Sequence, residues 1–346
     1  MNQRFVLFLL VVSLSSAAVL GQPSAETGIQ LETAFVGPDI WLHQDGCSVF
    51  HSNAHGNLEL VERAGSYAFE GEQIICPVLV HDANGVEDIK DVYMALAPDR
   101  GIETRCDLES DAVNASAYNA LVNGLPVSFD PLTMQAYLCT FTVETAGSMQ
   151  GQFYLGMYVV DLENASDHVD ESSYWYFNPD VSVTLTGSID FGTVSPGSNA
   201  YSTSLTIENT ASAGSGVFLD MYISGSDFYD PTSFGSLCPT SNVLTLDRFA
   251  YYASNGGYHT QTNNSRENPI GGLEGYYTIP YETGHPADRE QIIEGAGILN
   301  ISGKLFEAGN VLAPGAELTM DFRLALPEPC IGDFDDGQMF FWGVPI

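Results

Sequence analysis

The first residues with a capacity for chemistry are aspartates gathered in short turns. Asp333, Asp335 and Asp336 lie in the sequence GDFDDG, and further acidic residues lie in DLENASDHVDE, residues 161–171. Ca²⁺ prefers carboxylate oxygens, so both stretches are candidate calcium sites. GDFDDG departs from the EF-hand loop, because its glycine falls one position early and no glutamate follows at the required distance. A solvated, aspartate-rich turn is the competing interpretation.

A second candidate metal site consists of His43, Cys47, His51 and His55, which recur every four residues. On a helix they would form one face of ligands suited to Zn²⁺. Gly46, Ser52, Asn53 and Gly56 disfavour a helix here, and Cys47 is needed to keep the cysteine count even. A loop that carries a disulfide is therefore favoured.

Tyrosines provide a candidate binding surface for a glycan or a peptide. They lie in a polar, glycine- and asparagine-rich stretch at about 252–300, and they are Tyr251, Tyr252, Tyr258, Tyr276 and Tyr277. The run 174–177 is aromatic too, but alternate residues of a strand point into the core, and β-sandwiches use aromatic side chains heavily.

Catalytic signatures are missing from the sequence. It contains no G-x-S-x-G, H-E-x-x-H, C-x-x-C or phosphate-binding loop. We therefore expect a protein that is not an enzyme and has no cofactor apart from a possible Ca²⁺. A hydrolase whose site is assembled from distant strands ranks last among the functional hypotheses.

The charge of the chain narrows the choice of partners. Its 346 residues include 44 Asp and Glu but only 10 Lys and Arg, for a formal net charge of -34. Nucleic acids and anionic membranes both require clustered basic residues, so neither is an expected partner. The scarcity of bases also leaves many carboxylates without a salt-bridge partner, which favours cations from the medium.

Several features predict export. Residues 1–21 combine an initial Arg4, a short apolar core and small residues near a cleavage position, as in a signal peptide. No other stretch is long and apolar enough to span a membrane. Six cysteines fall four in the first half and two in the second, which predicts disulfides within domains, including Cys238–Cys330. Four N-x-S triplets are candidate glycosylation sites: Asn114, Asn164, Asn263 and Asn300.

Short alternating apolar runs between Gly, Asn, Asp and Pro clusters predict an all-β protein of antiparallel sandwiches. In residues 73–80, for example, Ile74, Cys76, Val78 and Val80 share one face. One helix is expected at 286–294, with Pro286 in its first turn and Gly295 after its end. The other expected strands are 91–97, 136–144, 151–161, 172–178, 203–209, 217–225, 244–253 and 317–327.

The length of the chain after the signal suits two sandwiches. We expect a leader at 22–60, a first sandwich at about 61–178 and a second at about 179–346. Asn178-Pro179 is the natural break, because a residue before proline is held extended. The stretch at about 252–300 is expected to be an insertion of loops and a short helix, too long for a hairpin loop.

The first sandwich resembles exported prokaryotic immunoglobulin-like domains, on the evidence of HDANGVEDIKDVYMAL, a strand–DxNGV–strand signature. Tyr137 stands where the tyrosine corner of such a domain would stand. The resemblance implies an inter-sheet Cys76–Cys139 disulfide, which leaves Cys47 with Cys106. A Cys106–Cys139 bridge is nearly as well supported, because Ile102, Cys106 and Leu108 fall on one face.

The second sandwich resembles immunoglobulin-like domains of the ASPM–SPD-2–Hydin type, through IDFGTVSPGSNAYSTSLTIENTA. Phe191 and Val194 would fill the core, Gly192 and Gly197 would permit the turn, and Asn209 would close the strand. As a whole the chain resembles exported tandem immunoglobulin-like surface proteins of archaeal type. That resemblance implies fold and location only.

These features favour a non-enzymatic, secreted or cell-surface protein with a structural or adhesive role, whose contact surface lies in the 252–300 insertion. Its expected partners are other surface proteins or glycans. A homopolymer is a further expectation, because the leader at 22–60 could add a strand to a neighbour's sheet edge. The alternative is a secreted glycan- or peptide-binding module, with or without a dependence on Ca²⁺.

Overall fold

The computed structural model describes residues 35–42, 47–97, 101–109, 128–232, 235–262, 264–267, 274–281, 289–301 and 304–346. The expected signal peptide, Asn114 and Asn263 lie outside these residues. From Val36 onwards the chain belongs to one compact unit. Within the described residues, no helix has the length and apolar character needed to cross a membrane.

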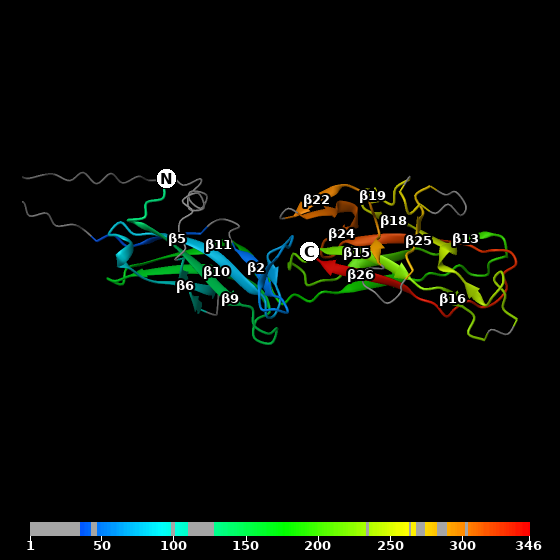
Figure 1. Ribbon diagram of the computed structural model, residues 1–346, viewed down its shortest axis with the longest axis horizontal. Coiled ribbons are helices and arrows are strands. Elements are labelled where there is room, and N and C mark those ends of the chain that lie inside the picture. The colour runs from blue at the N-terminus through cyan, green and yellow to red at the C-terminus, as the bar shows by residue number, and fades with distance from the viewer. Residues whose placement is uncertain are drawn as a thin grey trace, which may run out of the picture. The chain divides into compact units, whose positions relative to one another are not determined.

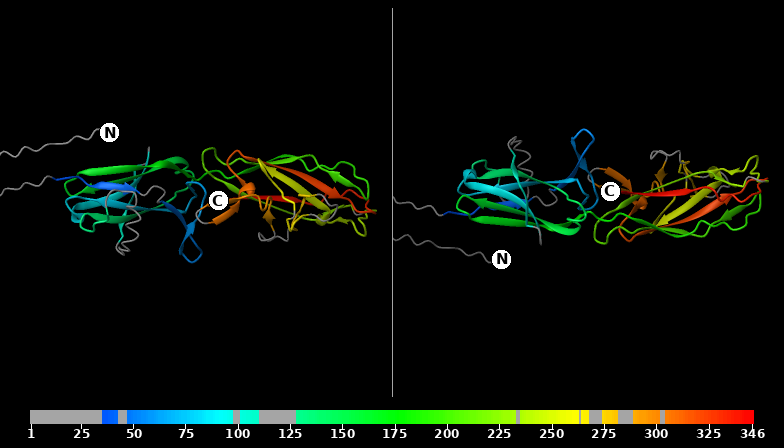
Figure 2. Two further views of the ribbon diagram at one scale, coloured as in Figure 1. Left: turned by 90° about the horizontal axis from the view of Figure 1, so that it is seen from above. Right: turned by 90° about the horizontal axis from the view of Figure 1, so that it is seen from below.

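The expected fold class is confirmed, because antiparallel β-strands dominate the described chain (Figure 1). The strands of residues 39–177 and those of residues 183–345 form separate sets of sheets (Figure 2). Each set encloses its own main apolar core. We call them the first and the second sandwich.

The first sandwich packs two sheets against each other across a core of Val, Ile, Met and aromatic side chains. One sheet has the order β3-β2-β5-β9-β8, and β1 also pairs with β5. Its strands are β1 (Asp39–Leu42), β2 (Ser48–Ser52), β3 (Leu58–Val61), β5 (Gln73–His81), β8 (Asp107–Leu108) and β9 (Met134–Thr142). The other sheet has the order β4-β11-β10-β6-β7, formed by β4 (Tyr67–Ala68), β6 (Ile89–Ala97), β7 (Gly101–Arg105), β10 (Gly151–Asp161) and β11 (Ser166–Phe177).

Residue alternation explains the central strand of the first sandwich. Ile74, Cys76, Val78 and Val80 of β5 are all fully buried in the core, on the face that the sequence predicted. Burying such side chains is worth about 1.5–3 kcal/mol each, which holds β5 in register with β9. A 3₁₀ turn, η1 (Val86–Asp88), connects β5 to β6.

The expected leader at 22–60 is wrong for its second part. Strands β1 and β2 both pair with β5, and β3 pairs with β2, so these three strands extend the first sheet. Ile40 and Val49 are each 4% exposed and belong to the core. These strands are only four or five residues long, too short for their alternation to stand out in the sequence.

The second sandwich is built from a seven-stranded and a four-stranded sheet around a single core. The larger sheet has the order β12-β14-β25-β18-β19, with β13 also paired with β25 and β20 with β18. Its strands are β12 (Val183–Gly187), β13 (Asn199–Tyr201), β14 (Leu205–Asn209), β18 (Phe249–Asn255), β19 (Tyr258–His259), β20 (Tyr277–Thr278) and β25 (Glu317–Ala325). The smaller sheet consists of β15 (Leu219–Gly225), β21 (Glu290–Gln291), β24 (Val311–Leu312) and β26 (Met339–Pro345).

Short elements complete the second sandwich. Two small hairpins pair β16 with β17 and β22 with β23. Their strands are β16 (Phe228–Tyr229), β17 (Val243–Leu244), β22 (Ile298–Ile301) and β23 (Lys304–Glu307), and two 3₁₀ turns are η2 (Leu246–Arg248) and η4 (Ala308–Asn310). Phe191 and Val194 pack against the core, and Gly192 and Gly197 have positive φ, as their expected roles require.

The expected helix at 286–294 is wrong wherever its residues are described. Glu290 and Gln291 form β21, which pairs with β15, and the next two isoleucines are fully buried in the core. Burial of Ile292 and Ile293 together with pairing to β15 outweighs the local helix signals, because most helical stability comes from packing one apolar face.

The disulfides correct the pairing implied by the immunoglobulin resemblance. Cys76 and Cys139 stand opposite each other on the neighbouring strands β5 and β9, but they bond to other cysteines, in the pairs Cys47–Cys76 and Cys106–Cys139. Cys106 lies where the chain passes from β7 of one sheet to β8 of the other, and its N–H donates to the Val92 carbonyl of β6. Cys238–Cys330 is present as expected. Tyr137 also differs from a tyrosine corner, since its hydroxyl donates to the side chain of Gln135.

Asn209 closes the end of β14, as expected from the sequence. It is fully buried, and its amide donates to the carbonyls of Val217 (2.9 Å) and Leu312 (2.8 Å). Its Oδ1 accepts from the backbone N–H of Ala211. One side chain thus satisfies three backbone groups from three segments.

We predict that Asn209→Ala lowers the free energy of unfolding by about 2–4 kcal/mol, because it leaves buried backbone groups without partners. Urea unfolding of the disulfide-intact chain measures the change. Ser182→Ala is the control: this exposed hydroxyl bonds Thr210 on the neighbouring segment, and its loss should cost less than about 0.5 kcal/mol. Equal effects of the two substitutions would contradict the assignment.

Candidate functional site

The structure divides the five candidate tyrosines into buried and accessible ones. Tyr251 and Tyr277 are fully buried, so they are core residues and not binding residues. They stand opposite each other on β18 and β20, with ring centroids 6.1 Å apart. Neighbouring residues on a strand point to opposite faces, so Tyr252 and Tyr276 lie on the outer side of the sheet.

A buried arginine holds the inner tyrosines and much of the 252–300 stretch. Arg266 donates to the hydroxyl of Tyr251 at 3.0 Å, to Glu294 at 2.7 Å and to the Thr278 carbonyl at 3.2 Å. Its guanidinium lies 5.4 Å from the Tyr277 ring centroid. Burial raises the pKa of Tyr251, which keeps its hydroxyl protonated beside the cation.

The expected insertion is therefore partly core, which corrects the prediction that all of 252–300 serves as a contact surface. Ile279, Ile292 and Ile293 belong to the same apolar cluster as the central strands. Among the described residues of this stretch, the outer side of β18 and β19 includes accessible side chains.

Four aromatic rings form a row on that outer side, which we call the tyrosine row: Tyr201, Tyr276, Tyr252 and His259. Tyr201 lies 6.2 Å from Tyr276, Tyr276 lies 5.9 Å from Tyr252, and Tyr252 stacks on His259 at 5.9 Å, all between ring centroids. Tyr201 is 52% exposed, His259 is exposed, and the two middle tyrosines are half-buried. Sequence reasoning missed Tyr201, since it lies on β13, about fifty residues before β18.

A glycine places Tyr276 beside Tyr252. Gly275 has φ +79°, and a β-carbon there would lie 3.1 Å from the Thr260 carbonyl oxygen and 3.5 Å from the Tyr252 ring. Only glycine fits this left-handed turn and close approach without strain. The turn is tied down by the Gly275 N–H, which donates to Glu267.

Polar groups of β25 lie beneath the row. Asp321 stands opposite Tyr252, and it accepts a 2.6 Å hydrogen bond from the Ser204 hydroxyl. Arg323 stands opposite Tyr201, is only 1% exposed, and donates to Asn199. Burial, followed by the nearby Tyr201 and Asp321, raises the pKa of Tyr276, so its hydroxyl is a hydrogen-bond donor at neutral pH.

The chemistry of the tyrosine row suits a ligand that is flat and amphipathic. Its ring faces attract the C–H groups of a ligand, while phenol hydroxyls, an imidazole and a carboxylate offer hydrogen bonds.

Tyr258, the remaining candidate, is 44% exposed but lies elsewhere: β-carbons placed on Gly297 and Gly309 would meet it at 3.2 and 2.8 Å. In the described chain no ring contact joins it to the row.

The candidate calcium ligands of GDFDDG do not converge. Asp333, Asp335 and Asp336 are all exposed. Among the described residues, the acidic side chains whose carboxylate oxygens do come together lie elsewhere. The backbone of the turn is instead held by Asp230, whose carboxylate accepts from Asp333 N–H. Hydrogen bonds from Ser236 and Thr232 hold the pKa of Asp230 well below its usual range.

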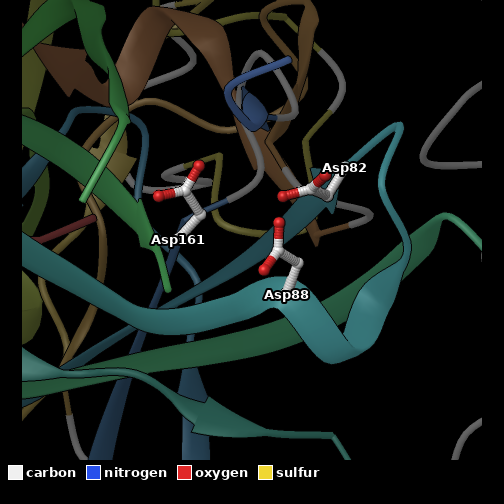
Figure 3. Close-up of side chains that lie close together, drawn as sticks. All are labelled: Asp82, Asp88 and Asp161. Carbon is white, nitrogen blue, oxygen red and sulfur yellow. The ribbon is translucent and has the colours of Figure 1, made fainter. Parts of the chain in front are cut away.

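A different set of carboxylates does converge, in the first sandwich. Asp82, Asp88 and Asp161 each have an oxygen within 4.8 Å of the others (Figure 3). Burial, and then the charges of Asp88 and Asp161, raise the pKa of Asp82 against the lowering effect of the Asn84 N–H. Asp161 belongs to the DLENASDHVDE stretch that the sequence singled out, whereas Asp82 and Asp88 were not candidates.

The remaining candidates are the histidine–cysteine set and the glycosylation asparagines. Cys47 is bonded to Cys76, so it is not a zinc ligand, and His43 lies outside the described residues. Of the glycosylation candidates that are described, Asn164 and Asn300 are both exposed.

Comparisons with known proteins leave the family open. No protein-family model and no curated protein sequence matches the chain. Among solved structures, the chain is similar to a protein described as BspA_C_WT, at 12% identity over 87% of this chain and 96% of that one, with a TM-score of 0.28. It is also similar to the serine-rich repeat adhesion glycoprotein Srr1 from Streptococcus agalactiae, at 9% identity over 86% and 96%, with a TM-score of 0.14. Scores this low support no inference about function.

We predict that Arg266→Met destabilises the second sandwich by about 3–5 kcal/mol, because Glu294 and the Tyr251 hydroxyl lose their buried partner. Urea unfolding measures this loss. Arg248→Met is the matched control, since Arg248 pairs with the adjacent Asp247 at a more exposed position, and its removal should cost less than about 1 kcal/mol. A small effect of Arg266→Met would contradict its organising role.

Proposed function

We propose that the chain is an exported, non-enzymatic cell-surface protein that adheres to glycans through the tyrosine row of its second sandwich. The observation that carries this proposal is the row itself: rings from β13, β18, β19 and the turn before β20 stand together on the outer side of one sheet. The sandwich core fixes the strands that present them.

A glycan fits this surface better than a charged polymer does. Sugar rings present C–H faces and hydroxyl groups, which match ring faces and hydrogen-bonding side chains without any need for opposite charge. The chain carries a net charge of -34, which repels phosphates and anionic lipids but has little effect on a neutral saccharide. Asp321 and His259 supply polar groups at two points of the row.

Placement outside the cell is supported by the cysteines. All six are paired in three disulfides, and the structure contains no free cysteine among its described residues. Disulfides of this kind persist in oxidising compartments. The resemblance of the sequence to exported tandem immunoglobulin-like proteins agrees with this location.

We expect the secreted chain to bind at least one class of neutral oligosaccharide on a glycan microarray. Tyr252→Ala and Tyr276→Ala should each weaken that binding about 5–30-fold, because each removes a ring face worth about 1–2 kcal/mol. Isothermal titration calorimetry with the best-bound oligosaccharide then measures the change in Kd.

Tyr154→Ala serves as the matched control. Tyr154 is 43% exposed and contacts Tyr174, but it lies on the first sandwich, so its loss should leave glycan binding unchanged. Wild-type protein that binds no glycan would refute the sugar proposal. Wild-type affinity in the Tyr252→Ala, Tyr276→Ala double variant would show that the glycan binds to a different surface. Binding to peptides and to no glycan would show that the ligand is a peptide.

A further inference from the structure

Two turns of the first sandwich bring three acidic side chains to one point (Figure 3). Asp82 follows the last residue of β5, Asp88 ends the 3₁₀ turn η1, and Asp161 ends β10. One carboxylate oxygen from each lies within 4.8 Å of the other two. Strands β6 and β10 are hydrogen-bonded neighbours, and Asp161 pairs with Ile89 directly after η1. The sheet therefore fixes the separation of Asp88 and Asp161.

Local hydrogen bonds orient each carboxylate. Oδ1 of Asp82 accepts from the backbone N–H of Asn84 at 2.8 Å, and Oδ1 of Asp161 accepts from that of Ala165 at 2.6 Å. The Asn84 amide donates to Asp88 Oδ2 at 3.2 Å. The Leu162 N–H donates to the Asp88 carbonyl, which ties the β10 turn to η1.

The environment of the second carboxylate oxygen of Asp82 indicates that a cation or a hydrogen-bond donor binds there. Asp82 is fully buried, and its Oδ2 has no hydrogen-bond partner in the described structure. Asp161 is only 1% exposed. An unpaired carboxylate oxygen in a buried position costs several kcal/mol, so such groups normally have a hydrogen bond or a cation.

No basic side chain of the described chain neutralises the three aspartates through an ion pair. Lys90 is connected to the turn after β10, but its ammonium donates to Asn164 Oδ1 at 3.0 Å. Glu163 adds another carboxyl next to Asp88. The site thus concentrates negative charge where water is largely excluded, and a bound cation would offset that cost.

We propose that Asp82, Asp88 and Asp161 bind one Ca²⁺ ion. Ca²⁺ holds oxygen ligands at about 2.4 Å, so two ligands of one ion stand at most about 4.8 Å apart, which the three oxygens satisfy. The donor set contains oxygen alone, which disfavours Zn²⁺. Mg²⁺ requires near-ideal octahedral geometry and prefers to keep its waters, so three carboxylates held by two separate turns suit the larger ion.

Calcium titration of the secreted, disulfide-intact chain tests this proposal. After treatment with EDTA and dialysis, isothermal titration calorimetry in about 0.15 M NaCl should detect one saturable Ca²⁺ site per chain, with weaker binding of Mg²⁺. Asp82→Asn and Asp88→Asn should each weaken Ca²⁺ binding about 10- to 100-fold or abolish it. Asn can keep the Asp82 hydrogen bond to the Asn84 N–H, and Asp88 is half-buried, so both variants are expected to fold.

Asp333→Asn is the matched control, with the same change of charge at an exposed aspartate of the second sandwich, and it should bind Ca²⁺ like the wild type. Circular dichroism before each titration confirms that the variants are folded. A wild type without saturable Ca²⁺ binding would overturn the proposal, as would folded Asp82→Asn and Asp88→Asn variants that bind as tightly as the wild type. Equal weakening by Asp333→Asn would indicate diffuse surface binding, and would also overturn it.

Discussion

The pairing of β18 with β25 is the constraint on which the proposed binding face depends. Six residues of each strand stand in register, and side chains alternate between the two faces. Tyr251 and Phe322 enter the core, while Tyr252 and Asp321 face outwards. A slip of one residue would exchange these two sets, so that the tyrosine row would be buried and the core side chains exposed. The hydrophobic free energy gained by burying Tyr251 therefore also keeps Tyr252 on the outer face. Arg266 strengthens the same register, because it bonds the hydroxyl of Tyr251 and the backbone of β20.

The fold class followed from the sequence because long strands carry a strong two-residue period. Residues 73–80 alternate over four core positions, and the structure buries all four. Where a segment is short, the period is too weak to detect, as in β1 and β2, or tertiary pairing overrides local preference, as in β21. The disulfide pattern had a different cause of error. The immunoglobulin resemblance put Cys76 and Cys139 on opposite sheets, whereas they lie on neighbouring strands of one sheet, and the alternative Cys106–Cys139 bridge is the one that forms.

The two sites were predictable to different degrees. The tyrosine-rich stretch drew attention to the region of the proposed surface, but only the register of β18 with β20 separates Tyr252 and Tyr276 from their buried neighbours. Tyr201 carried no signal, because its strand reaches the row through pairing with β25. The three aspartates come from two turns about eighty residues apart in the chain, and acidic residues are so common here that no spacing distinguishes them. Their convergence is a property of the folded sheet.

The central claim is that the outer side of β18 and its neighbours is a glycan-binding surface. NMR spectroscopy of protein with ¹³C-labelled tyrosine rings, titrated with the oligosaccharide that binds best, tests it most directly. The account predicts that the ring signals of Tyr201, Tyr252 and Tyr276 shift with a common Kd, while those of the buried Tyr251 and Tyr277 stay nearly unchanged. Shifts confined to tyrosines outside the row, such as Tyr154 and Tyr174, would contradict it.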